Sequence, residues 1–141
     1  MPYKYIEGLT TADVAFEAKG KTLNELFESA ALALFDIMAE PKKVSKKIKK
    51  TFSIEKDNLE ELMYNFLDEI LFFKDSESMV FNSCKVNVKK IEKLKLEATL
   101  FGDKVNHKKQ ELKVDPKAVT MHKFEVKKEK DSYKARVIID I

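Results

Sequence analysis

The sequence predicts an α+β protein in which two helices pack on largely antiparallel β-sheet. Apolar residues recur every three or four positions in residues 22–39 and again in residues 57–73, which is typical of helices with one buried face. Several other segments alternate between apolar and polar residues, as half-buried strands do. With 141 residues and 44% hydrophobic content, the chain is long enough to form its own core. We therefore expect a single domain over residues 1–141.

The expected helix over residues 22–39 is the element around which the remaining segments are arranged. Every position from Ala30 to Phe35 is apolar, so we expect this middle turn to be covered on most sides. Thr22 and Glu25 have the spacing of a capping box, and Pro41 follows the end of the helix.

The second expected helix spans residues 57–73, with Asp57 and Glu60 as its cap. Its apolar stripe faces the core and its other face is acidic. We expect the aromatic residues Phe66, Phe72 and Phe73 to belong to the core, and residues 74–78 to form a polar loop.

The remaining patterns predict strands, with a turn at Gly102 and Asp103. The expected strands cover residues 3–9, 11–18, 78–91, 93–101, 118–128 and 132–141, together with a segment that points Ile48, Phe52 and Ile54 inward. Before that segment, residues 42–50 hold six lysines and no acid. They form either a patch for RNA or phosphate, or a solvated sheet edge, and the second interpretation is favoured because lysines commonly protect exposed edges.

Composition narrows the possible classes of protein. No apolar run reaches the roughly 18 residues needed to cross a membrane, and the first residues lack the apolar core of a secretory signal. Cys84 is the only cysteine, and we expect it to be a small buried side chain. These features favour the cytosol. The basic residues are lysines except for Arg136, and lysine is poorly suited to bidentate recognition of phosphates or bases.

Two aspartates are out of phase with the core. Asp13 and Asp140 each lie in an expected strand but point away from its apolar face, and the α-carboxylate of Ile141 lies next to Asp140. If the two strands are neighbours, these groups could share a hard divalent cation such as Ca²⁺ or Mg²⁺. The alternative is two solvated aspartates on separate strands. We expect no catalytic role for His107 or His122.

Three segments of the chain, in order, resemble the archease family. They are residues 11–40, which begin Thr-Ala-Asp-Val, residues 116–122, which contain Lys-Ala-Val-Thr, and the final residues 137–141, which end in Asp-Ile. The resemblance extends over essentially the whole chain. One departure is Thr10, where the family commonly has a histidine, and Gly102, Asp103 and His107 fit a further family pattern only loosely.

The resemblance implies a non-enzymatic accessory protein. Archeases assist the RtcB-type RNA ligase of tRNA splicing and RNA repair by promoting its guanylylation and its multiple turnover, so contact with RNA would be indirect. The resemblance also implies a divalent metal, calcium in family members, bound by Asp13, Asp140 and Ile141, and a partner contact at Lys117. Two alternatives remain open. One is a nucleic-acid-binding module or a chaperone for RNA-modifying enzymes, and the other is a metal-dependent hydrolase that uses the same carboxylates.

Overall fold

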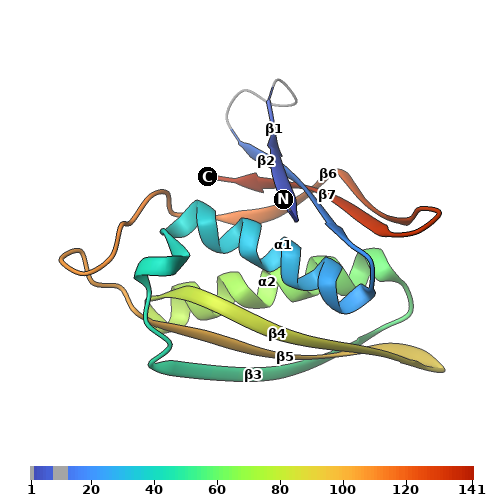
Figure 1. The fold of residues 1–141 in the computed structure, drawn as a ribbon, viewed down its shortest axis with the longest axis horizontal. Helices are drawn as coiled ribbons and strands as arrows, with labels where there is room; N and C mark the ends of the chain where they lie inside the picture. Colours follow the sequence, from blue (N-terminus) through green and yellow to red (C-terminus); the bar gives the residue numbers. More distant parts are fainter. Residues whose placement is uncertain (1, 8–12) are drawn as a thin grey trace.

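The computed structural model describes residues 2–7 and 13–141, in which two helices lie between two antiparallel sheets (Figure 1). The α+β class predicted from the sequence is confirmed, although the pattern gave no sign that the strands divide into two sheets. The helices are α1 (Leu23–Met38) and α2 (Leu59–Glu77). The strands are β1 (Tyr3–Ile6), β2 (Val14–Gly20), β3 (Ile48–Lys56), β4 (Met79–Ile91), β5 (Lys93–Lys104), β6 (Ala118–Lys128) and β7 (Tyr133–Asp140).

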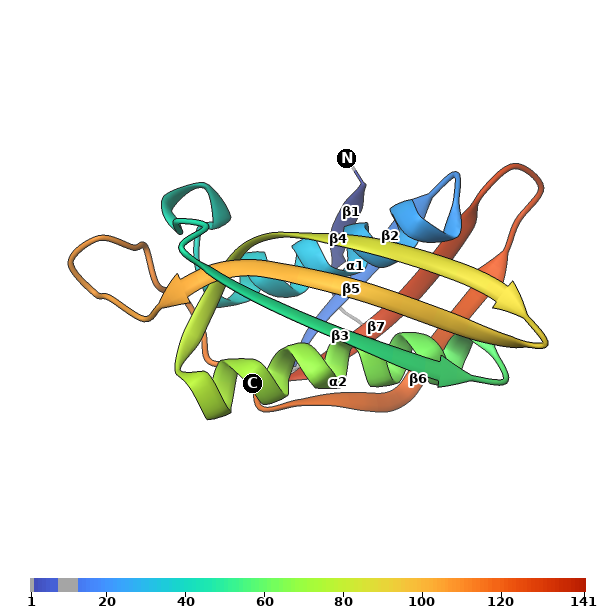
Figure 2. The same ribbon diagram turned by 90° about the horizontal axis from the view of Figure 1, so that it is seen from below.

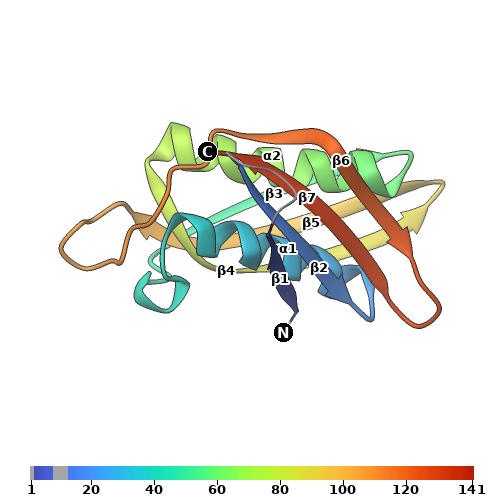
Figure 3. The same ribbon diagram turned by 90° about the horizontal axis from the view of Figure 1, so that it is seen from above.

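The two sheets cover opposite sides of the helices. The four-stranded sheet has the order β1-β2-β7-β6, and Figure 3 shows it from above, with α1 and α2 beneath it. The three-stranded sheet has the order β3-β5-β4 and covers the helices from below (Figure 2). Both sheets therefore bury one face on the same helical layer, and the opposite face of each is free to carry other side chains.

The first helix forms as predicted. The Thr22 hydroxyl accepts a hydrogen bond from the Glu25 N–H (3.1 Å), and the Glu25 carboxylate accepts one from the Lys21 N–H (2.8 Å). After the helix, a short 3₁₀ turn covers Pro41–Lys43. Because α1 lies between both sheets, buried residues occur around most of its circumference, as the all-apolar middle turn predicts.

The second helix differs from the prediction at both ends. Its cap is Asn58, whose side-chain oxygen accepts a hydrogen bond from the Glu61 N–H (2.9 Å), whereas Asp57 is exposed, so the cap prediction of Asp57 with Glu60 was wrong by one residue. The helix also continues through the predicted polar loop to Glu77 and ends at Ser78, which adopts a left-handed conformation (φ 49°). The continuation is stabilised because Lys74, in this extra turn, is buried and paired.

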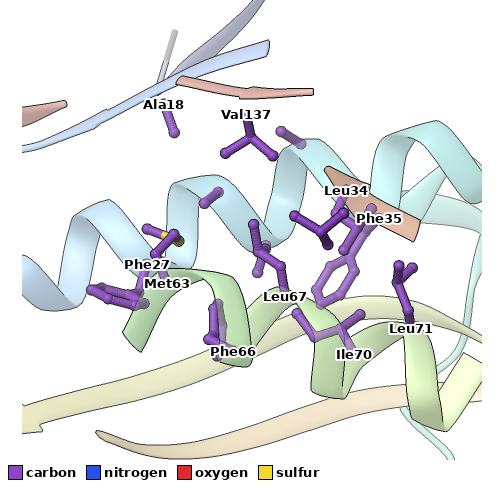
Figure 4. Close-up of a cluster of buried hydrophobic side chains, with 14 of the residues drawn as sticks. Ala18, Phe27, Leu34, Phe35, Met63, Phe66, Leu67, Ile70, Leu71 and Val137 are labelled. Atoms are coloured by element: carbon purple, nitrogen blue, oxygen red, sulfur yellow. The ribbon is translucent and has the colours of Figure 1, made fainter. Parts of the chain in front are cut away.

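The core fills the space between the helices and both sheets (Figure 4). Phe27 meets Phe66 edge-to-face with ring centroids 5.5 Å apart, and Phe73 packs against Phe52 of β3. The prediction that Phe72 belongs to this core was wrong, because Phe72 points away from the helix's buried face and is 58% exposed.

Several strand boundaries also differ from the predicted ones. Gly102 does not turn the chain but lies inside β5, where an added Cβ would come within 2.1 Å of the Val80 carbonyl oxygen, so only glycine fits this close approach. Residues 8–12 lie outside the described residues, so the predicted ends of strands 3–9 and 11–18 there are not described. Asp13, predicted within a strand, lies in the bend just before β2.

The lysine-rich stretch leads into an edge strand, in agreement with the favoured interpretation. β3 is at the edge of its sheet, and Ile48, Phe52 and Ile54 pack against the core as predicted. Lys50 also points inward, where it forms an ion pair with Glu77 at the end of α2. The stretch is thus not a uniform basic surface.

Candidate functional site

The pairing of β2 with β7 brings the two predicted metal ligands to one end of the four-stranded sheet. Val14 is paired with Ile139, and this is the last pair of the antiparallel register. Asp13 lies in the bend that comes directly before Val14, and Asp140 directly follows Ile139, so both aspartates adjoin this last pair. The condition that the sequence left open, that the two strands are neighbours, is therefore met.

On β7 the side-chain directions follow the predicted alternation. Ala135, Val137 and Ile139 are fully buried toward the helices, and Ile141 packs against the same core. This anchors the last residues, so that Asp140 projects from the outer face of the sheet. The sequence pattern did not indicate that Ile138, on the same outer face as Asp140, is only 1% exposed.

The outer face next to the aspartates is apolar. Ala15 pairs with Ile138 on one side and Thr120 pairs with Ile138 on the other, and both Ala15 and Ile138 are buried. The Thr120 hydroxyl is also buried and has no hydrogen-bond partner among the described residues. Surroundings of this kind strengthen electrostatic interactions with any cation held by the neighbouring carboxylates.

β6 completes this end of the sheet. Ala118 pairs with Asp140, and the Lys117 N–H donates a hydrogen bond to the Asp140 main-chain oxygen (2.7 Å). The side chain of Lys117 is exposed. The structure thus places the three expected metal ligands, Asp13, Asp140 and Ile141, around one corner of the sheet. Lys117, the expected partner contact, lies at the same corner.

The oxygen atoms of these residues are the type of ligand that a hard divalent cation prefers. They are too few to fill its coordination shell. Asp13 and Asp140 supply carboxylate oxygens and Ile141 supplies main-chain oxygen, and oxygen is the ligand that Ca²⁺ and Mg²⁺ prefer. Among residues 2–7 and 13–141, however, there is no group of three or more His, Cys, Asp or Glu residues with the spacing of a metal site. Since Ca²⁺ takes about six to eight oxygens, water or a partner protein would have to complete its shell.

The other candidate residues lie elsewhere. Asp103 is on the three-stranded sheet, where its carboxylate accepts a hydrogen bond from the Ser45 hydroxyl (2.8 Å), which lowers the pKa of Asp103. His107 is exposed in the connection after β5, where it lines a pocket together with Asp115 and Pro116. Residue Thr10 lies outside the described residues.

Cys84 behaves as a packing residue. It contacts the core from β4, and burial, followed by the nearby charge of Glu28, raises the pKa of its thiol to about 12. A thiol that stays protonated at neutral pH is a weak nucleophile. The prediction of a small packing residue is therefore confirmed, but Cys84 is only partly buried, not fully buried as predicted.

Two features of the structure had no clear signal in the sequence. The first is a register shift in β6 between Thr120 and Glu125, where Lys123 has φ 53° and its carbonyl accepts a hydrogen bond from Arg136 (3.0 Å). The second is Lys74, which the apolar pattern assigned to a loop but which is buried next to Asp115 and Pro116. The only sequence signal for Lys74 is that it lies one helical turn after the buried Ile70.

Comparison with known proteins adds the family. The model of the Archease protein family matches residues 3–141. "Protein archease" of Pyrococcus abyssi is 39% identical over 133 residues, which cover 93% of this chain and 94% of that protein. "Protein archease" of Archaeoglobus fulgidus is 35% identical over 141 residues, with both chains covered completely.

Solved structures agree with this assignment. The solution structure of Methanobacterium thermoautotrophicum protein 1598 is 34% identical, covers 99% of both chains and has a TM-score of 0.82. The crystal structure of an archease from Thermotoga maritima, described as a possible chaperone, covers 94% of this chain with a TM-score of 0.64, and at 19% identity it supports the fold alone. On the family match and these identities, the chain belongs to the archease family.

Proposed function

We propose that this protein is a cytosolic, metal-binding accessory protein that activates an RtcB-type RNA ligase in tRNA splicing and RNA repair. It would promote guanylylation of the ligase and its multiple turnover, without catalysing a reaction of its own. Membership of the archease family supports an accessory role. The observation that carries the proposal further is the pairing of β2 with β7, which brings Asp13 and Asp140 to the same end of the sheet.

In this proposal the chain's own residues present a cation to the partner. Asp13, Asp140 and a main-chain oxygen of Ile141 would hold Ca²⁺ or a similar divalent ion. The ion, when bound, would supply a positive charge with coordination positions that oxygens of the partner or of a bound nucleotide could fill. The exposed side chain of Lys117 adds a second positive charge at the same corner and would contact the partner.

The incomplete ligand set supports an action through contact with another protein. A site with two carboxylates and one further oxygen is open on its solvent side, so a partner can approach the ion directly. The core residues on the opposite face of β2 and β7 would keep the two ligand-bearing strand ends in register during this contact.

Substitution of the two aspartates tests the proposal. Asp13→Ala and Asp140→Ala should each abolish stimulation of an RtcB-type ligase, measured as guanylylation of the ligase with GTP and as RNA joined per ligase molecule. Asp131→Ala is the matched control, because Asp131 is an exposed aspartate in the β6–β7 turn at the opposite end of β7. Full stimulation by either site variant, or equal loss with the control, would contradict the proposal.

A further inference from the structure

Lys74 is an unusual residue in this lysine-rich chain because its side chain is buried. It lies in the last turn of α2 and is 9% exposed, and among the described residues only Ser29 is another buried polar side chain. Burying an ammonium group is unfavourable unless the charge is paired and hydrogen-bonded. The position of Lys74 therefore calls for a structural or functional reason.

The ammonium group of Lys74 reaches across to the segment that precedes β6. Nζ is 2.7 Å from Asp115 Oδ1, 2.7 Å from Asp75 Oδ1 and 2.5 Å from the Pro116 carbonyl oxygen. Burial alone would lower the pKa of Lys74, but the hydrogen bonds to Asp115 and Asp75 outweigh burial and the pKa is raised. Lys74 thus stays charged and uses all three of its N–H donors.

The segment held by Lys74 leads directly to the aspartate pair. Two residues before Asp115, the segment is hydrogen-bonded to the end of α1, where the Lys113 N–H donates to the Met38 carbonyl (2.9 Å). Directly after them, the Lys117 N–H donates to the main-chain oxygen of Asp140 (2.7 Å). Figure 3 shows this part of the chain passing the end of α2 and then entering β6 next to the C-terminal end of β7.

We propose that Lys74 is a positioning residue for the proposed metal site: by fixing Asp115 and Pro116 against α2, it holds the Lys117 amide, and with it the main chain of Asp140, in place. Lys74 itself touches neither aspartate of the pair. The expected effect of Lys74 on metal binding rests on the proposed function. The expected effect of Lys74 on the Lys117–Asp140 hydrogen bond does not depend on it.

A second lysine provides a matched control. Lys50 also forms an ion pair at the C-terminal end of α2, with Glu77, but it comes from β3 on the three-stranded sheet, away from β6 and β7. Removing either lysine deletes a partly or fully buried charge from the same end of α2. Only the removal of Lys74 releases the segment that leads to Asp140.

The test compares Lys74→Met, Lys74→Arg and Lys50→Met in the full chain. Calcium affinity is measured by titration calorimetry with Ca²⁺ alone, and exchange of the Lys117 amide hydrogen is followed by NMR. Lys74→Met should weaken calcium binding about tenfold, in line with other residues that support metal ligands, and should speed exchange at Lys117. Lys74→Arg should restore both, because arginine can still donate to Asp115 and Pro116, and Lys50→Met should change neither.

Every other result either supports or overturns the positioning role of Lys74. Unchanged calcium affinity and exchange in folded Lys74→Met, or equal changes in Lys50→Met, would overturn the inference. If the unsubstituted protein binds no Ca²⁺, the metal site of the proposed function fails, and exchange at Lys117 alone decides whether Lys74 positions this strand end. Should Lys74→Met not fold, Asp115→Ala takes its place, because that carboxylate is 81% exposed and its loss leaves Lys74 paired with Asp75.

Discussion

Calcium should stabilise the protein through the aspartate pair, and Asp140→Ala should remove this effect. A ligand that binds only the folded state raises the free energy of unfolding by about 2.7 kcal/mol when its concentration is 100 times its dissociation constant. For a chain of 141 residues, the entropy of unfolding at the midpoint is about 0.3 kcal/mol per kelvin. The melting temperature of the unsubstituted protein should therefore rise by about 9 °C.

Without metal, the same substitution should be harmless. Asp140 projects from the outer face of the sheet, so its truncation opens no core cavity, and the main-chain hydrogen bond from Lys117 is kept. Like charges at neighbouring strand ends repel each other, which destabilises a sheet by a few tenths to about 1 kcal/mol. Metal-free Asp140→Ala should therefore melt at the same temperature as the unsubstituted protein, or up to about 3 °C higher.

The assay is a set of four melting curves, with and without Ca²⁺, for the unsubstituted protein and for Asp140→Ala. Asp131→Ala should respond to Ca²⁺ like the unsubstituted protein. An equal rise in the melting temperature of Asp140→Ala would refute the assignment of Asp140 as a ligand. Unfolding of the metal-free variant would show that Asp140 has a structural role.

Three further predictions concern other parts of the molecule. Replacing Lys46, Lys47 and Lys49 by Ser should leave ligase stimulation intact, and tight, salt-sensitive RNA binding lost in this variant would instead favour a nucleic-acid-binding module. Asn58→Ala should lower the free energy of unfolding by about 1 kcal/mol in urea titrations, and a neutral effect would contradict the cap. The raised pKa of Cys84, about 12, means that its contribution to stability is complete below about pH 8.5, the value for a free thiol, and is lost as pH rises toward 12. Urea titrations at pH 7 and 10 should show this extra loss in the unsubstituted protein but not in Cys84→Ala.

Local patterns predicted the helices well because caps and apolar stripes depend only on residues that are close in sequence. The capping spacing of Thr22 and Glu25 and the all-apolar turn of α1 depend on neighbours within one or two helical turns. The errors on α2 have the same origin. Asp57 and Asn58 are both good capping residues, and only the backbone geometry at Asn58 decides between them.

Long-range contacts could not be predicted in this way. The polar character of Lys74 argues for a loop, and its helical position depends on Asp115 and Pro116, which are about 40 residues away along the chain. The register shift of β6 and the division of the strands into two sheets likewise depend on pairing between distant segments. Such pairings leave no periodic pattern in a single sequence.

The aspartate pair could be predicted from local pattern only in part. Phase in the predicted strands indicated that Asp13 and Asp140 point away from the core, but only the pairing of β2 with β7 brings them to the same end of the sheet. Resemblance to the archease family supplied the expectation that they act together. The two kinds of reasoning agree on the same residues, and metal binding by these residues remains a prediction.

The most direct test of the central claim is a crystal structure of the protein with bound Ca²⁺. We predict one calcium ion with a carboxylate oxygen of Asp13 and one of Asp140 each at about 2.3–2.6 Å, the usual calcium–oxygen distance. A further ligand should be a main-chain oxygen of Ile141. Calcium bound elsewhere, or the two carboxylates directed to opposite faces of the sheet, would contradict the account.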